Sequence, residues 1–262
     1  MENAKAVVLH SGGLDSTTLI TKALDDGCTD ILALTVRYGS LHNEAEGLAA
    51  QQVFEWLQRE YDDVNFTRLV ITIPSAIFEG EASALMGEIA MPQLTYKEIT
   101  EGQGPSPTVV PFRNANLLSA ATAIADARNY NYVYIGAHGE DAHNWAYPDC
   151  TPEFLGAMAN AIYIGTYDKV RLRFPFIWMV KADIVALASE LGAPLEMTWS
   201  CYNPKVVDDG EFIHCGQCPT CIERANAFMQ AGFLDPTGYY ISLEQILDCD
   251  PRELESLEDW EV

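Results

Sequence analysis

The first residues whose types and spacing can do chemistry are the nine at 10–18, which read His-Ser-Gly-Gly-Leu-Asp-Ser-Thr-Thr. They follow a short aliphatic run and precede a helical pattern, so we expect a turn between a strand and a helix. The glycines let the backbone approach phosphate oxygens, and amides at a helix start point toward an anion. Ser11, Ser16 and Thr17 add hydroxyl donors, while Asp15 beside phosphate needs magnesium or a donor. This pattern predicts a phosphate-binding loop.

Two common nucleotide motifs do not fit the loop, because the Lys of GxxxxGK[ST] and the GxGxxG pattern are both absent. The segment instead resembles the SGGxDS motif of the PP-loop, or N-type ATP pyrophosphatase, superfamily. That resemblance implies an ATP site that activates a carboxyl or carbonyl oxygen. The plain alternative is a Gly-Ser turn without a ligand. The residues assigned to nucleotide binding are Leu9, His10, Ser11, Gly12, Gly13, Leu14, Asp15, Ser16, Thr17, Thr18 and Leu19.

A second chemical pattern is formed by four cysteines, Cys201, Cys215, Cys218 and Cys221. Short CxxC loops place sulfurs on one side of a metal ion, and four thiolates complete the tetrahedral shell that Zn²⁺ prefers. The full set leaves no open position, which favours structural zinc over a catalytic redox pair. An iron–sulfur cluster fits four cysteines chemically and ranks below zinc. His214 is a possible substitute ligand that four cysteines make unnecessary.

Further motifs accompany these two in a fixed order: Val110–Asn114, Tyr147–Phe154, Lys181, Thr198–Tyr202 and Cys218–Ala225. From about residue 5 to about residue 237, the chain resembles the 7-cyano-7-deazaguanine synthase family. The resemblance implies conversion of 7-carboxy-7-deazaguanine, ammonium and ATP into 7-cyano-7-deazaguanine. ATP activates the carboxylate, ammonia makes the amide, and a second activation dehydrates the amide to the nitrile. It also implies structural Zn²⁺, Mg²⁺ with the ATP, and a homodimer.

The resemblance suggests roles for individual residues. We expect Asp15, Ser16, Arg113 and Lys181 to be catalytic. Arg113 offers a planar fork for a carboxylate or phosphate, and Lys181 offsets charge on the activated intermediate. A surface salt bridge and a surface lysine at a helix start are the plain alternatives for these two cations.

Substrate recognition is expected from polar residues of the middle motifs. Asn114 either hydrogen-bonds substrate or caps the following helix. Asp141 and Asp149 either read the amino-pyrimidinone edge or are solvated loop acids, and Cys150 is given no nucleophilic role. The predicted substrate residues are Arg113, Asn114, Asp141, Tyr147 and Asp149.

The elements that must position these residues alternate between strand and helix. Such alternation predicts an α/β fold: an open parallel sheet, Rossmann-like, of the adenine-nucleotide PP-loop type, with a C-terminal zinc-binding helical module. Ligands bind beyond the carboxyl ends of such strands. The expected strands are 6–10, 31–36, 68–73, 132–136 and 170–174, and the expected helices are 15–24, 42–60, 114–128, 152–164 and 180–191.

The remaining segments complete the expected organisation. Residues 74–110 have weak periodicity and predict a long loop or lid. Residues 243–262 are acidic and predict an exposed helix or tail. We expect an ATP-binding and catalytic domain at 1–198 and a zinc-binding module with an acidic tail at 199–262.

Composition narrows the partners. The 262 residues carry a formal charge of −23, which disfavours nucleic acid because phosphate binding rests on Lys and Arg. The acid excess fits either a generally acidic protein or a salty cytoplasm. No run approaches the length of a membrane helix, and no secretory signal is present, so we expect a cytoplasmic protein with small-molecule partners.

Three segments depart from the resemblance: Gly136–Cys150 looks longer than in common members, the spacer between Cys201 and Cys215 is extended, and residues 37–41 differ in type. The family commonly shows an acidic residue, Tyr-Gly-Gln and a basic residue before a His, whereas this chain has Arg37, Ser40 and Leu41 at the differing positions. The alternative function is a related ligase that stops at the amide or transfers the deazaguanine acyl group to another amine. A tRNA sulfur-transfer enzyme and a nucleotide-binding regulator without chemistry are further alternatives.

Overall fold

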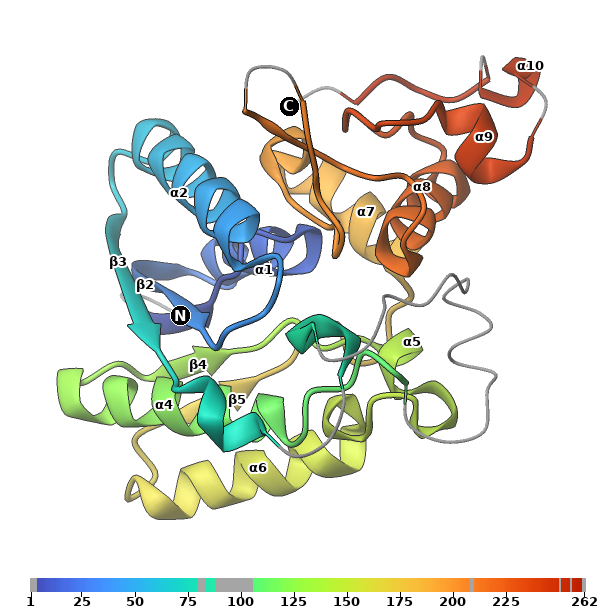
Figure 1. Cartoon of the computed structure of the whole chain (residues 1–262). Coiled ribbons are helices and arrows are strands. Elements are labelled where there is room, and N and C mark those ends of the chain that lie inside the picture. Colours follow the sequence, from blue (N-terminus) through green and yellow to red (C-terminus); the bar gives the residue numbers. More distant parts are fainter. Residues whose placement is uncertain are drawn as a thin grey trace.

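The computed structural model describes residues 4–79, 83–87, 106–207, 210–249, 251–254 and 256–260. Its main sheet has five strands, all parallel, in the order β3-β2-β1-β4-β5 (Figure 1). The predicted open parallel α/β fold is therefore confirmed. The strands are β1 (Ala4–Leu9), β2 (Cys28–Arg37), β3 (Asn65–Thr72), β4 (Tyr132–Tyr134) and β5 (Arg171–Arg173).

Both faces of the sheet are covered, because its central strand is apolar on both sides. Ala6 and Val8 of β1 belong to one buried core, and Val7 and Leu9 belong to the other. A strand buried on both faces needs helices above and below it. Helices α1 (Leu14–Asp25), α2 (Asn43–Glu60) and α7 (Lys181–Glu190) cover the first face, and α4 (Arg113–Arg128) and α6 (Pro152–Gly165) cover the second.

The strand order reverses beside β1. The chain passes from β1 to β2 and β3 on one side, and β4 and β5 then lie on the other side. In open parallel sheets, the connections after the two strands at this switch point diverge and leave a crevice for ligands. The predicted phosphate loop follows β1, so the topology places it at this crevice.

Shorter elements complete the described chain. The antiparallel pair β6 (Lys205–Val206) and β7 (Phe212–Ile213) lies within the cysteine-bearing region. None of the described helices is long and apolar enough to cross a membrane. The remaining helices are α5 (Gly139–Ala142), α8 (Pro219–Ala231), α9 (Leu243–Leu247) and α10 (Pro251–Leu254), with short 3₁₀ turns η1 (Ser75–Phe78), η2 (Ala84–Met86), η3 (His143–Trp145), η4 (Pro148–Cys150) and η5 (Leu195–Met197).

Two sequence expectations concern the less regular segments. Of the predicted loop at 74–110, residues 80–82 and 88–105 lie outside the described residues, and the rest includes η1 and η2. The expected acidic helix or tail at 243–262 contains α9 and α10, and its acids Glu253 and Glu258 are exposed, but an aromatic residue near its end packs against the fold. The ring of Trp260 lies 5.3 Å from Phe228 and 5.4 Å from Phe233, because burying these rings removes apolar surface from water. The domain division at residue 198 stays a prediction.

Candidate active site

A cavity of about 250 Å³ lies at the switch point of the sheet. Its walls come from the β1–α1 loop, the starts of α2, α4, α7 and α8, and the segment after β4. The Trp199 amide donates to the Gly12 carbonyl at 2.8 Å, which joins the β1–α1 loop to the segment before the cysteines. Residues from all over the sequence therefore meet in one place.

The β1–α1 loop holds its shape through its own hydrogen bonds. Gly12 has a φ of +87°, and a Cβ there would lie 2.4 Å from the backbone nitrogen of Ala50, so this position needs glycine. The Ser16 hydroxyl donates to the Gly13 carbonyl at 3.1 Å and accepts from the Ser11 amide at 3.2 Å. The start of α1 thus presents a preformed turn to the cavity.

Lys181, the first residue of α7, is the centre of a charged cluster that we call the Lys181 group: Lys181, Asp15, His138, Asp141 and Glu223. Its Nζ donates to Asp15 Oδ2 at 2.7 Å and lies 3.1 Å from His138 Nε2 and 3.7 Å from Glu223 Oε2. Burial lowers the pKa of Lys181, but the carboxylates of Asp15, Glu223 and Asp141 outweigh it and raise the pKa overall. Lys181 is therefore a buried, permanently charged cation.

The carboxylates of this group are incompletely paired. Asp15 Oδ1 and Glu223 Oε1 are buried and have no hydrogen-bond partner among the described residues. Burial raises the pKa of Glu223 to about 8, although Lys181 lowers it. Unpaired buried oxygens are costly, so a site that keeps them suits a ligand or ion that completes their coordination. Oxygen ligands of this kind fit Mg²⁺.

A second cluster lies around Arg113, and we call Arg113, Tyr38, His42, Glu46 and Tyr202 the Arg113 group. Burial lowers the pKa of Arg113, but neighbouring acidic groups that include Tyr38 outweigh it, so the pKa is raised. The His42 and Tyr202 rings are 5.0 Å apart at an angle of 34°. Arg113 Nε donates to the side-chain oxygen of Asn114 at 3.3 Å, which orients the guanidinium at the start of α4.

Asn114 and Asp149 contact each other rather than the cavity centre. The Asn114 amide donates to Asp149 Oδ2 at 2.8 Å, and the Asn114 side chain donates to the Asp149 carbonyl at 3.2 Å and to Cys150 Sγ at 3.2 Å. The carboxylate of Asp149 thus satisfies an orphan amide at the start of α4. Asn114 lines the cavity, whereas Asp149 is absent from its walls.

The other wall of the cavity comes from the segment between β4 and α6. The Tyr147 hydroxyl lies 2.6 Å from the Thr108 hydroxyl and accepts a hydrogen bond from the Ser106 hydroxyl at 3.1 Å. Burial raises the pKa of Tyr147 to about 12, so the phenol is neutral. Burial also raises the pKa of the Cys150 thiol well above its usual value, which agrees with the absence of a nucleophilic role.

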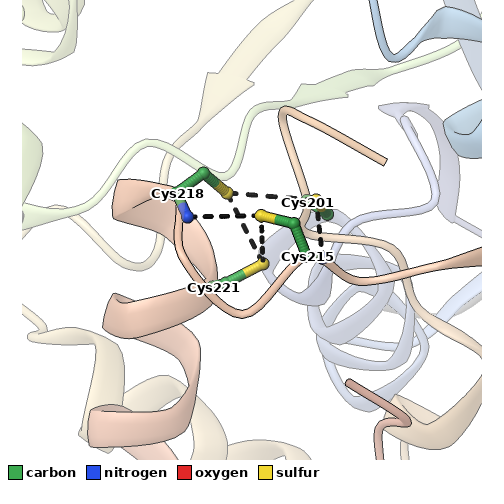
Figure 2. A group of neighbouring side chains, drawn as sticks. All are labelled: Cys201, Cys215, Cys218 and Cys221. Atoms are coloured by element: carbon green, nitrogen blue, oxygen red, sulfur yellow. Dashed lines mark hydrogen bonds between the residues drawn. The ribbon is translucent and has the colours of Figure 1, made fainter. Parts of the chain in front are cut away.

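The four predicted metal ligands are buried together beside the cavity. The sulfurs of Cys201, Cys215, Cys218 and Cys221 all lie within 4.8 Å of one another (Figure 2). Backbone amides point at them: Cys215 N donates to Cys201 Sγ, and Cys218 N donates to Cys215 Sγ, both at 3.3 Å. Four convergent sulfurs that accept hydrogen bonds from backbone amides fit a tetrahedral metal ion such as zinc. Such an ion would hold together the three segments that carry the cysteines.

His214 stays outside this sulfur set. Its Nε2 accepts from the Ser200 amide at 3.0 Å, and its ring stacks on Trp199 with centroids 4.1 Å apart. Burial lowers the pKa of His214 to about 3, so the ring is neutral. The expectation that four cysteines suffice is therefore in keeping with the geometry.

Arg224 connects the cysteine region to the rest of the molecule. The Arg224 side chain is 1% exposed, and its Nε donates a hydrogen bond to the Asp235 carboxylate. Its Nη1 donates to the Thr198 hydroxyl at 2.7 Å, and its Nη2 donates to the Leu195 carbonyl at 2.9 Å. Because α8 begins at the cysteines and carries both Glu223 and Arg224, this anchoring also holds Glu223 against Lys181.

Comparison with known proteins identifies the family. Residues 5–232 match the family model described as queuosine biosynthesis protein QueC. The chain belongs to this family. A relative from Methanospirillum hungatei named 7-cyano-7-deazaguanine synthase is 38% identical over 90% of this chain and 99% of its own length. Relatives with the same name from Archaeoglobus fulgidus and Hahella chejuensis are 39% and 34% identical over 88% and 90% of this chain, and 89% and 93% of their own lengths.

A solved structure of the U34-tRNA thiolase NcsA from Methanococcus maripaludis, with its [4Fe-4S] cluster, has a TM-score of 0.47 and 14% identity. The match covers 78% of this chain and 62% of that chain. This similarity is too low to carry any property of that protein over to a QueC family member.

The structure brings most of the predicted site residues of this QueC family member together. Seven of the assigned loop residues line the cavity, together with Arg113, Asn114, Asp141, Tyr147 and Lys181, whereas Gly12, Thr17, Thr18, Leu19 and Asp149 do not. The loop residues at the cavity are Leu9, His10, Ser11, Gly13, Leu14, Asp15 and Ser16. Their roles in binding and catalysis stay predictions.

Several cavity-lining residues with ionisable side chains were not among the predicted site residues, including Glu46, His138 and Glu223. The sequence pattern could have indicated Glu46, because it lies on the apolar face of its helix. That face also carries the buried residues Ala45, Ala49 and Val53. Glu223 lies two residues after Cys221, and its position in the sequence does not predict that it reaches the cavity.

The three substituted positions within residues 37–41 do not line the cavity, whereas the longer segment Gly136–Cys150 contributes several residues to its walls. The cavity walls do not include Arg37, Ser40 or Leu41. They do include two neighbours of these residues, Tyr38 and His42. The Leu41 side chain is 57% exposed, and Ser40 hydrogen-bonds Asn43 at 2.8 Å. These three substitutions therefore alter the support of the wall rather than its lining.

Proposed function

We propose that this protein converts 7-carboxy-7-deazaguanine, ammonium and ATP into 7-cyano-7-deazaguanine. The observation that carries the proposal is the meeting of the β1–α1 loop, Lys181 and Arg113 in one cavity. The loop suits the phosphates of ATP, and the two cations suit a carboxylate that is being phosphorylated or adenylated. Membership of the QueC family and the shared name of its relatives support the same substrate.

In this proposal, the first step activates the substrate carboxylate. A carboxylate oxygen attacks the γ-phosphorus of ATP and ADP leaves, or it attacks the α-phosphorus and pyrophosphate leaves. Loop amides and the Ser11 and Ser16 hydroxyls hold the phosphates, and Lys181 stabilises the charge that develops on them. The buried Asp15 Oδ1 and Glu223 Oε1 are placed to hold the accompanying Mg²⁺. Arg113 fixes the carboxylate for attack.

The second and third steps make the nitrile. Ammonia attacks the activated carbonyl carbon, and the phosphorylated oxygen leaves, which forms the amide. A second ATP then activates the amide oxygen. Loss of that oxygen with its phosphate, and of two protons from nitrogen, forms the carbon–nitrogen triple bond. The same Lys181 group serves both activations, because both place negative charge at the same phosphate positions.

Cellular setting and assembly belong to the same proposal. We propose a homodimer in the cytoplasm, in line with the family resemblance and with the use of ATP. We also propose that it does not bind nucleic acid, since a formal charge of −23 repels phosphate. We further propose that residues 1–198 form the catalytic domain and residues 199–262 the zinc-bearing module.

The product assay tests this function. Purified protein is incubated with 7-carboxy-7-deazaguanine, ATP, Mg²⁺ and ammonium, and the products are identified by mass spectrometry. We expect the nitrile, with the nucleotide product, ADP or AMP, read in the same run. A product that stays the amide, or an adduct on another amine, would favour the alternative ligase. ATP binding without substrate-dependent turnover would favour a regulator.

A further inference from the structure

The proposed mechanism leaves one buried carboxylate of the cavity unused, that of Glu46. It lies in the first turn of α2 and lines the cavity, with its side chain 20% exposed. His42 Nε2 lies 3.5 Å from Glu46 Oε2. No hydrogen bond to its carboxylate comes from the described residues. Glu46 therefore presents acceptors to the cavity that the protein itself leaves unfilled.

His42 does not neutralise this carboxylate. Burial lowers the pKa of His42 to about 4, so the imidazole is uncharged near neutral pH. Burial raises the pKa of Glu46 to about 8, and the guanidinium of Arg113 lowers it only in part. A carboxyl group in this setting lacks the donors that would stabilise its charged form. A ligand with N–H groups would supply them.

The surroundings of Glu46 suit a flat ligand. Tyr38, His42 and Tyr202 contribute aromatic rings to the cavity wall, and the His42 and Tyr202 rings lie 5.0 Å apart. Aromatic faces pack well against planar heterocycles. Arg113 interacts electrostatically with Glu46, so the two side chains are close. The donors of the guanidinium and the acceptors of the carboxylate can therefore contact the same ligand.

We propose that Glu46 reads the amino-pyrimidinone edge of the substrate, accepting hydrogen bonds from ring N1–H and from the 2-amino group. Two carboxylate oxygens match two adjacent N–H donors. The neighbouring edge of the same heterocycle carries the ring carbonyl and the 7-carboxylate, which are acceptors for the fork of Arg113. The inference rests on the proposed function, because it names the residue that recognises that substrate.

The other acids in or near the cavity contact other groups of the protein. Asp149 accepts from the Asn114 amide at the start of α4. Asp15 and Glu223 contact Lys181, and Asp141 lies 3.5 Å from His138 in the same group. Among the described residues that line the cavity, Glu46 is the carboxylate beside Arg113. It lies away from the Lys181 group, which is assigned to the phosphates.

The test combines a variant with a substrate analogue. Wild type, Glu46→Gln and Glu44→Gln are compared on 7-carboxy-7-deazaguanine and on the analogue that lacks the 2-amino group. Glu44 is the control, because it is an exposed acid in the first turn of the same helix. We expect wild type to prefer the natural substrate by about 100-fold in kcat/KM, as a buried charged acceptor loses a donor in the analogue.

Glu46→Gln should lower kcat/KM for the natural substrate by about 10- to 100-fold and shrink the preference to a few-fold, with KM for ATP unchanged. Glu44→Gln should behave as wild type. The glutamine is isosteric and carries no charge, so the variant should fold. Calorimetric binding of the two compounds without ATP gives a second readout of the same preference.

An unchanged preference in Glu46→Gln, or a change confined to KM for ATP, would overturn the role of Glu46 while leaving the proposed function in place. A different result would overturn both the role of Glu46 and the proposed function. In that case, wild-type protein would neither consume ATP in a substrate-dependent way nor bind 7-carboxy-7-deazaguanine in the calorimeter. The two failures are thus distinguishable in one set of measurements.

Discussion

The cysteine set and the Lys181 group are two buried clusters of ionisable side chains, yet they are completed in different ways. The four sulfurs lie within 4.8 Å of one another and accept hydrogen bonds from backbone amides, so a single metal ion could complete the site. The Lys181 group keeps two buried carboxylate oxygens, on Asp15 and Glu223, without a partner among the described residues. One cluster is closed and the other is open to the cavity.

The difference indicates what each cluster contributes. A closed set of ligands stabilises the fold, because its groups are fully paired once the ion is present. An open set costs stability in the absence of ligand, and such unpaired charge is typical of sites that bind and react. Removal of a group should therefore cost mainly stability in the first cluster and mainly rate in the second.

The largest effect is expected from removal of the metal ion. Cys218→Ser should lose bound metal and destabilise the protein by more than about 3 kcal/mol, since metal binding energy is folding energy. Metal content and the thermal unfolding midpoint measure this. Cys249→Ser, outside the sulfur set, is the matched control and should keep both. Unchanged melting after complete chelation would contradict a closed structural site.

The next effect tests the open cluster. Lys181→Met should lower kcat by about 10³-fold, because a buried cation that stabilises transition-state charge is lost. Single-turnover rates and thermal melting are measured together. Lys169→Met, at an exposed lysine paired with Asp126, should keep wild-type rates. A variant of Lys181 with less than a tenfold loss would remove this residue from the proposed chemistry.

A smaller effect is expected at the link between the two clusters. Asp235→Asn removes the buried partner of Arg224 and should cost about 3 kcal/mol of the free energy of unfolding. Asp25→Asn removes a largely exposed partner of Lys22 and should cost under about 1 kcal/mol. Denaturant titration separates the two. Equal costs would show that Arg224 does not anchor α8 as the geometry implies.

The smallest effect is a pH dependence on the Arg113 side of the cavity. The pKa of Glu46 is raised from 4.5 to about 8, so its contribution to stability is present below about pH 4.5 and is lost as the pH rises through about 8. Because the Glu46 side chain is 20% exposed, solvent reduces this loss below the roughly 5 kcal/mol that the full shift implies, and Glu46→Gln should flatten it by about 1–2 kcal/mol between the two limits. Denaturant titrations at several pH values measure it, and parallel curves for wild type and variant would refute it.

Local patterns in the sequence were enough for the parts that depend on neighbouring residues. The run from strand to loop to helix at residues 10–18 predicted β1, the turn and α1, because chain direction and glycine geometry are set locally. The CxxC spacings likewise predicted the sulfur set, since short loops bring their cysteines together regardless of the rest of the fold.

Other features were decided only by the tertiary structure. Lys181 meets Asp15 across 166 residues, and that contact exists because α7 and the β1–α1 loop end at the same switch point of the sheet. Asp149 was expected at the substrate but caps α4, while Glu46 and Glu223 reach the cavity without a motif of their own. The sequence alone thus determined which chemistry the chain carries. Long-range packing decided which charges face one another, because pairing across a sheet depends on strand order rather than on spacing along the chain.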